Sequence, residues 1–334
     1  MREPRARPRF AFAVLATAGT LAGAVAAPQL PASPSKLVLP HATHVGDALP
    51  AHTTRVASTR ALQRTTKGWE TFTTANVAVS VSPSYEDAED AARRWAGFVL
   101  GLIHGEELDG LTLYLGTVGE VAAICGIDAS GCYGSPSSDI VSVGDASTGV
   151  RPEAIVAHEY GHYIAAHRDN APWKALDWGT KRWATHVGVC AGVRAKKLFP
   201  ADQLWKYMLN PGEGFAEAYR VLNAQPVGDG STMDWPIVHR LFYPDAKTLA
   251  AIRRDVTEPW TAPTEVRLTG RLDARGHARV AVRTPLDGTL EVAARGATIR
   301  GSNTLRTTVC GTRSTKLALA GRAGARFVLN VTRP

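Results

Sequence analysis

The sequence lacks several features that mark particular protein classes. Only four of its 334 residues are cysteines, and none forms a C-x-x-C pair, which argues against a cysteine zinc site. Aromatic residues make up 7% and do not alternate with basic ones, so no nucleic acid is expected as a partner. With 45% hydrophobic and 20% charged residues, the chain is not a wholly disordered protein, a collagen or a coiled coil.

Long apolar runs are absent too, apart from one near the N-terminus. Four arginines precede an apolar run from Phe10 to Ala27 that ends in small residues, the pattern of a Sec-type signal peptide. An N-terminal membrane anchor is the alternative, although the run is rich in Ala, Gly and Thr. We therefore expect residues 1–27 to be a signal peptide, and a secreted, extracellular protein without a membrane span after its removal.

Composition divides the rest of the chain into three parts. Residues 28–68 are rich in Pro, Ala, Thr and His without an apolar period, which indicates a linker or pro-segment. In residues 69–261 strand and helix patterns alternate, whereas residues 262–334 show short alternating strands between Gly, Asp and Asn turns. The predicted fold class is α+β, a mixed domain followed by a small all-β sandwich or barrel.

Within the mixed domain the periodicity places individual elements. The strand at 139–145 is predicted either as an edge strand, to which a peptide could pair, or as an interior strand. Residues 172–209 are predicted to be largely helical. The remaining predicted elements are strands at 70–81 and 111–116 and helices at 84–103 (with Ser84 as N-cap), 152–167, 211–224 and within 236–256.

Four cysteines in an exported chain predict two disulfides, with three possible connectivities. The short loop between Cys125 and Cys132 is the easiest pair to close. That pairing would leave Cys190 and Cys310 to join the mixed domain to the β domain.

Charge is distributed unevenly. The net charge is +8, but residues 28–261 have 21 basic and 25 acidic residues, whereas residues 262–334 have 13 basic and four acidic ones. The basic β domain either docks on an anionic cell-wall polymer or carries solvated charge that follows from Arg-rich composition.

The motif His158-Glu159-Tyr160-Gly161-His162 is the main chemical signal. On a helix, residues four apart share one face, so both imidazoles can bind one Zn²⁺ while Glu159 serves as general base. The alternative is a structural helix with two hydrogen-bonded histidines. Apolar flanks place this helix in the core, where an unexplained His pair and a Glu would be costly.

A zinc site needs a third ligand from the protein. The elongated form of the motif would require His at position 168, where this chain has Arg168. Glu213 and Glu217, in PGEGFAEAYR, lie four residues apart on one predicted helix. One of them can bind the metal and the other can accept the free ring N–H of a ligand histidine, and the residues alone leave their order open.

HEYGH and GEGFAEAYR together resemble the gluzincins, with the E-x-F-A-E spacing of the lethal-factor and Pro-Pro endopeptidase type. The resemblance covers about residues 150–225 and implies a zincin-like metallopeptidase domain with a small mixed sheet, an active-site helix and a helical second half. It further implies that the zinc ligands are His158, His162 and Glu213, that Glu159 is the general base, and that Glu217 supports a ligand.

In that family a Tyr before the glutamate helix hydrogen-bonds the tetrahedral intermediate, a role that Tyr207 would take here, with a packed aromatic as the alternative. His239 is the other candidate donor to the oxyanion, with an ordinary core or surface histidine as its alternative. The predicted function is that of a secreted zinc metalloendopeptidase acting on polypeptide substrates. Two alternatives remain, a zincin-like binding or cell-wall-docking protein without protease activity and a zinc amidase that acts on cell-wall peptides.

Overall fold

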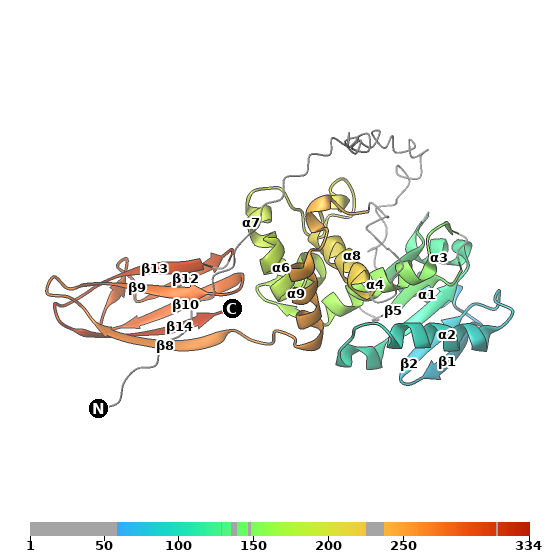
Figure 1. Ribbon diagram of the computed structural model, residues 1–334, viewed down its shortest axis with the longest axis horizontal. Coiled ribbons are helices and arrows are strands. Elements are labelled where there is room, and N and C mark those ends of the chain that lie inside the picture. Colours follow the sequence, from blue (N-terminus) through green and yellow to red (C-terminus); the bar gives the residue numbers. More distant parts are fainter. Residues whose placement is uncertain (1–58, 128, 135–138, 146–147, 225–236, 312) are drawn as a thin grey trace, which may run out of the picture. The chain divides into compact units, whose positions relative to one another are not determined.

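The computed structural model describes residues 59–334 except 128, 135–138, 146–147, 225–236 and 312. The predicted signal peptide and residues 28–58 of the predicted linker lie outside these described residues. As expected from the sequence, a mixed α+β region is followed by an all-β region (Figure 1). The described part of the chain contains no helix whose length and hydropathy would allow it to cross a membrane.

The mixed region is built on a five-stranded sheet in the order β1-β2-β3-β5-β4. Its strands are β1 (Glu70–Thr74), β2 (Val77–Val81), β3 (Thr112–Gly116), β4 (Gly131–Gly134) and β5 (Asp139–Val143). The prediction of one strand over 70–81 was wrong, because Ala75 and Asn76 have φ of 45° and 69° and reverse the chain in a two-residue hairpin.

Strand β5 is interior. It pairs in parallel with β3 on one side and antiparallel with β4 on the other, so its backbone is not available to a peptide as an edge strand. The edge beside the HEYGH helix is β4, which the sequence pattern did not reveal. Strand β4 is only four residues long and begins and ends with glycine, which weakens any periodic signal.

Two features near the start of the mixed region also differ from the prediction. Helix α2 begins three residues later than Ser84 would allow, with Asp87 in the cap position. The last part of the predicted linker forms a short helix, on which buried Leu62 packs in a cluster with residues of α3. The described helices before the β region are α1 (Thr59–Thr65), α2 (Ala88–Leu100), α3 (Val118–Cys125), α4 (Pro152–Ala166), α5 (Ala175–Trp178), α6 (Lys181–Val187), α7 (Val189–Arg194), α8 (Pro211–Ala224) and α9 (Ala246–Thr257).

Short elements connect these helices. The region 172–209 is less helical than predicted, because it contains one two-residue strand and a 3₁₀ turn besides its short helices. The connecting elements are η1 (Glu106–Gly110), β6 (Asp169–Asn170), β7 (Trp173–Lys174), η3 (Tyr207–Leu209) and η5 (Arg240–Phe242).

The all-β region contains two antiparallel sheets, ordered β12-β10-β14-β8 and β11-β13-β9. Alternate apolar side chains from both sheets form one shared core, with Leu290, Leu317 and Leu329 at 3% exposure or less, so the region is a β-sandwich. Its strands are β8 (Thr264–Arg271), β9 (His277–Thr284), β10 (Gly288–Arg295), β11 (Thr298–Ile299), β12 (Thr304–Val309), β13 (Arg313–Ala320) and β14 (Arg326–Arg333).

Both expected disulfides are present, and they have the connectivity that the short loop favours. Cys125 pairs with Cys132 seven residues on, and Cys190 in α7 pairs with Cys310 across 120 residues of sequence. The first closes the turn between α3 and the edge strand β4, and the second links the helical region covalently to the β-sandwich.

Candidate metal centre

Helix α4 carries HEYGH through the centre of the mixed region. Pro152 begins the helix, where its missing N–H costs no hydrogen bond. Nearly every side chain from Ile155 to Ala165 is buried, so the helix is fixed from all sides by packing. The rings of His158 and His162 lie on one face with their centroids 5.0 Å apart.

Helix α8 lies directly against this face. Its first turn is capped by the side chain of Asn210, which accepts the backbone N–H of Gly212 at 3.0 Å. Gly161 lets the two helices approach closely, because a Cβ atom there would lie 2.7 Å from the Cα of Ala216. This contact brings the glutamates of α8 within reach of the histidines of α4.

Three side chains converge where the helices meet. Glu213 Oε2 lies 3.3 Å from Nε2 of His158 and 3.2 Å from Nε2 of His162, and all three side chains are fully buried. One ligand atom from each residue lies within 4.8 Å of the others. Zinc–ligand bonds of about 2.0–2.1 Å set neighbouring ligands of a tetrahedron roughly 3.4 Å apart, so the two contacts match a shared metal.

The donor set also fits zinc chemically. Two imidazole nitrogens and one carboxylate oxygen form a set that Zn²⁺ binds at catalytic sites. Within the described residues, Nδ1 of His162 is buried without a hydrogen-bond partner, as are Oε2 of Glu159 and Nε1 of Trp95. His158, His162 and Glu213 therefore form a group that can hold a metal ion.

Glu217 lies behind His158, on the side away from the converging ligand atoms. Its Oε2 accepts a hydrogen bond from Nδ1 of His158 at 3.2 Å, which directs Nε2 of that ring toward Glu213. Arg220 in turn donates two hydrogen bonds to the Glu217 carboxylate, at 2.6 and 3.0 Å. This carboxylate–histidine arrangement is the one that orients metal ligands in many sites. Arg220 was not singled out from the sequence, although its place three residues after Glu217 was a usable signal.

Glu159 lies where α4 meets the edge strand β4. Its side chain packs beside Gly131, and the backbone N–H of Tyr133 in β4 donates to the carboxylate. The partnerless Oε2 is therefore held at the junction of α4 and the edge strand. Gly131 leaves the space for this, because a Cβ there would lie 3.3 Å from Cγ of Glu159.

The pKa values of the buried site residues are set by two opposing effects, burial and the close pairing of histidines with glutamates. Burial disfavours the imidazolium form of His158, but hydrogen bonds to Glu213 and Glu217 outweigh it and raise the pKa of His158 to about 10. Burial also opposes ionisation of Glu213, yet the adjacent His162 and His158 hold its pKa well below the ordinary value. The pKa of Glu217 is lowered too, since hydrogen bonds from His158 and Arg220 exceed the effect of burial.

For two residues, burial is the main cause of the pKa shift. Burial lowers the pKa of His162, which favours the neutral imidazole that a metal requires. Burial raises the pKa of Glu159 to about 8, against a smaller opposing effect of His158. A carboxylate with a pKa in this range can both accept and return a proton near neutral pH.

Of the remaining predicted site residues, Tyr207 reaches the cluster and His239 does not. The Tyr207 hydroxyl donates to Oε2 of Glu213 at 2.8 Å. The His239 ring instead caps the η5 turn, where Nδ1 accepts the backbone N–H of Leu241 at 3.3 Å. Gln203, which no sequence pattern singled out, places its amide nitrogen 3.5 Å from Oε1 of Glu213.

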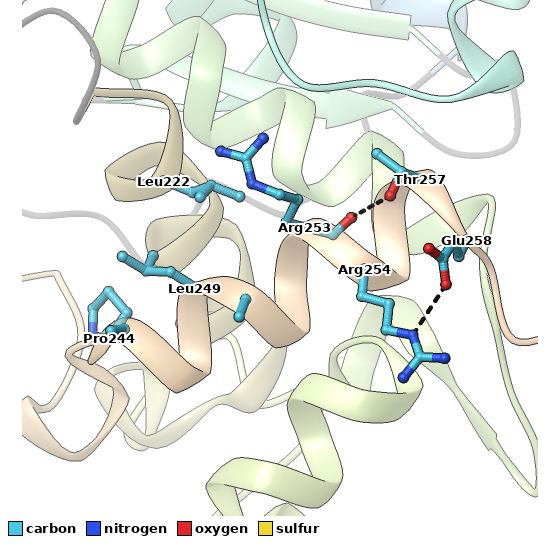
Figure 2. A pocket seen from close by; sticks show the side chains of 9 residues that line it. Leu222, Pro244, Leu249, Arg253, Arg254, Thr257 and Glu258 are labelled. Atoms are coloured by element: carbon cyan, nitrogen blue, oxygen red, sulfur yellow. Dashed lines mark hydrogen bonds and ion pairs between the residues drawn. The ribbon is translucent and has the colours of Figure 1, made fainter.

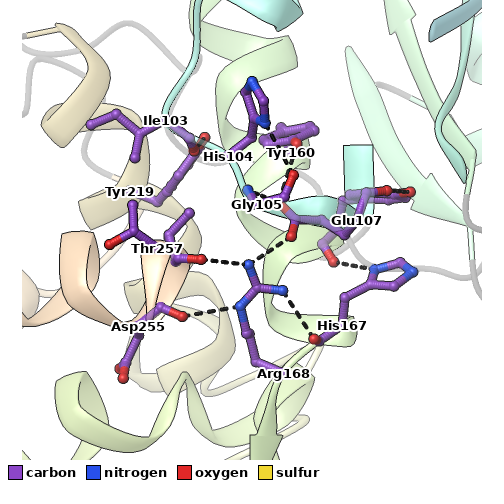
Figure 3. Close-up of polar contacts among 12 residues, drawn as sticks. Ile103, His104, Gly105, Glu107, Tyr160, His167, Arg168, Tyr219, Asp255 and Thr257 are labelled. Carbon is purple, nitrogen blue, oxygen red and sulfur yellow. Dashed lines mark hydrogen bonds and ion pairs between the residues drawn. The ribbon is translucent and has the colours of Figure 1, made fainter. Parts of the chain in front are cut away.

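A polar network fastens the far end of α4 (Figure 3). Arg168, where the elongated motif would have its third histidine, forms a buried ion pair with Glu107 at 2.6 Å. Arg168 also donates to the backbone carbonyl of Asp255 in α9, and the Tyr160 hydroxyl reaches Glu107 at 3.4 Å. This position therefore anchors the helix.

A separate hollow of about 530 Å³ lies along α9 (Figure 2). Leu222 and Leu249 line it, and the charge of Arg254 is paired with Glu258 at 3.1 Å. None of His158, His162 and Glu213 lines this hollow.

In comparisons with protein-family models and with curated proteins, nothing matches this chain.

Proposed function

We propose that the protein is a secreted zinc metalloendopeptidase with a zincin-like catalytic domain of the gluzincin type. The convergence of His158, His162 and Glu213, with the unpaired Oε2 of Glu159 one residue from a ligand, is the observation that carries the proposal. A structural histidine pair would not need a third buried carboxylate shared at 3.2 and 3.3 Å.

His158, His162 and Glu213 would hold the zinc, with His158 oriented by Glu217. When bound, zinc would supply a Lewis acid that polarises the scissile carbonyl and acidifies a bound water.

The chain's own groups supply proton transfer and charge stabilisation. Glu159 would take a proton from the attacking water and return it to the leaving amine, for which its raised pKa is suited. The Tyr207 hydroxyl would donate to the carbonyl oxygen as negative charge develops there, whereas Nδ1 of His239 is engaged by the backbone N–H of Leu241. Burial of the ligand side chains excludes bulk water, which strengthens these interactions.

The experiment compares zinc content and hydrolysis of a quenched peptide by the wild type, Glu159→Gln and Glu213→Gln. We expect about one zinc per wild-type chain, zinc retained but hydrolysis lost in Glu159→Gln, and weaker zinc binding in Glu213→Gln. The matched control is Glu153→Gln, which changes an exposed glutamate of the same helix. Metal-free wild type, or equal hydrolysis by Glu159→Gln, would refute the proposal in favour of a binding protein.

Two disulfides support the secreted location, because such bonds persist in oxidising compartments. Mass measurement of the exported protein tests the location directly. A mature chain that lacks residues 1–27 is expected, and retention of these residues in an intracellular protein would contradict it.

We also propose that the β-sandwich docks on an anionic polymer such as one from the cell wall. On the outer face of the β9–β13 pair, exposed Lys316 stands opposite Ala281, between exposed Arg279 and Arg283. The two arginines are about 13 Å apart along the strand, and neither strand carries an acidic residue. Such a face suits repeated negative charges.

Purified bacterial cell walls are the probe for this docking. Replacing Arg279, Arg283 and Lys316 with glutamine should release the protein from the walls at a lower salt concentration than the wild type, without changing peptide hydrolysis. Arg267→Gln with Arg271→Gln, on exposed positions of the other sheet, is the control. Equal retention of all variants would exclude this face as the docking surface.

A further inference from the structure

An exposed apolar surface lies beside the candidate metal centre. We call it the apolar strip, and its members are Leu204 (62% exposed), Trp205 (93%), Met208 (46%), Leu241 (41%) and Tyr243 (44%). Among the large apolar side chains of the described residues, Trp205 is the most exposed. A solvated tryptophan with apolar neighbours is the composition of a recognition surface rather than of an ordinary exterior.

The strip is attached to the metal centre through hydrogen bonds. Its first three members flank Tyr207, whose hydroxyl donates to Glu213, and the amide of Gln203 approaches the same carboxylate. Its other two members follow His239, whose backbone N–H donates to the carbonyl of Met208 at 2.8 Å. Three members of the strip are therefore on the segment that contacts the cluster, and the other two are on a second segment that is hydrogen-bonded to the first.

The size of the strip indicates what it would bind. Five partly exposed side chains of this kind offer on the order of 500 Å², within the range of functional surface patches. A stable interface with a folded partner needs about 800 Å² on each side. The strip is thus large enough for one or two side chains of an extended peptide and too small for a second folded domain.

Two charged side chains of the first segment, Asp202 and Lys206, are engaged by groups other than the strip side chains. Asp202 is occupied by the backbone N–H groups of Leu204 and Lys206, at 3.0 and 2.9 Å. The ammonium of Lys206 lies 5.1 Å from the ring centroid of Phe199. Neither charge is paired with a strip side chain, so aliphatic or aromatic side chains fit this surface better than acidic ones.

We infer that the apolar strip is a specificity subsite that binds a bulky aliphatic or aromatic side chain of the peptide, within a few residues of the bond that is cleaved. The inference rests on the proposed function, because the cleaved bond must lie at the metal centre. Met208 suits such a role because its flexible side chain adapts to ligands of different shape.

The test uses quenched decapeptides in which one position at a time, within three residues of the cleaved bond, is Leu, Phe, Gly or Asp. The wild type should prefer Leu or Phe over Gly by at least tenfold in kcat/KM at one position. Trp205→Ala should lose most of this preference through a higher KM, with turnover of the Gly peptide and zinc content unchanged. Ile127→Ala, at another exposed apolar residue (78% exposed), is the control and should retain the preference.

A second measurement separates this inference from the proposed function. Glu159→Gln is titrated with the Leu and Gly peptides, with and without Trp205→Ala. Tighter binding of the Leu peptide that depends on Trp205 supports the subsite even if no hydrolysis is found. Equal binding in both backgrounds, or a wild-type dimer in sedimentation that Trp205→Ala dissociates, overturns it.

Discussion

At the scale of single residues, the site depends on groups that hold other groups in place. The two hydrogen bonds from Arg220 fix the Glu217 carboxylate, and that carboxylate fixes the His158 ring. The carboxylate would otherwise be a buried anion without its cation. Both side chains are almost wholly buried, so solvent cannot replace the lost bonds.

Arg220→Lys keeps the charge but cannot donate the same pair of hydrogen bonds. We therefore expect zinc affinity to fall about 10- to 100-fold, measured by competition with a chelator. Arg254→Lys is the control, because Arg254 also pairs with a nearby glutamate, Glu258, but on the exposed surface of α9. Unchanged zinc affinity in Arg220→Lys would show that the pair does not orient His158.

Lys181 is a second buried residue whose surroundings lead to a testable prediction, a change of stability with pH. Its Nζ donates to the Ala171 carbonyl at 2.6 Å and lies 4.4 Å from the Trp260 ring centroid. Burial lowers the pKa of Lys181 from 10.5 to about 8, although the charges of Asp287 and Asp255 act in the opposite direction. The folded protein thus binds this proton more weakly than the unfolded chain.

Between pH 8 and 10.5 the unfolded state keeps the Lys181 proton while the folded state releases it, so stability rises with pH. Relative to Lys181→Met, wild-type stability should increase by on the order of 2–3 kcal/mol across this window and stay level below it. Denaturant titrations of both proteins at several pH values measure this. A difference that falls with pH would contradict the lowered pKa.

At the scale of elements, the contact between helices α4 and α8 determines how closely the histidines and glutamates of the site approach one another. Gly161 is the closest point, with the backbone of Ala216 occupying the space of a side chain. Glycine is required at position 161 for steric reasons, although helix propensity alone would favour alanine there.

Gly161→Ala should separate the helices and cost about 1–3 kcal/mol of stability, with weaker zinc binding. Gly97→Ala, inside α2 where a Cβ meets nothing within 4 Å, should instead raise stability by about 0.5–1 kcal/mol. Thermal unfolding and zinc titration of both variants give the comparison. Equal effects of the two substitutions would mean that the helices can separate at no cost.

At the scale of the whole molecule, the two disulfides constrain loops of very different length. Cys125–Cys132 closes seven residues of separation and Cys190–Cys310 closes 120. In the chain-entropy account, the longer loop restricts the unfolded chain more.

Replacing Cys190 and Cys310 with alanine should therefore cost about 4–5 kcal/mol, against about 2–3 kcal/mol for Cys125 and Cys132. Equilibrium denaturation under non-reducing conditions measures both losses. If the two losses are equal, or the order is reversed, loop length does not govern the stability of this chain.

The sequence by itself determined the α4 helix with His158 and His162 on one face, the division into an α+β and an all-β region, and the shorter disulfide as the easiest pair. These features depend on local spacing and periodicity, which a chain expresses without its neighbours. Only the tertiary structure decided that Glu213 lies between the two imidazoles and Glu217 behind one of them, because i and i+4 positions are equivalent until another helix packs on them. The tertiary structure also decided that β5 is an interior strand, that Arg220 anchors Glu217 and that Trp205 is exposed. Each of these features depends on which distant segments pack together.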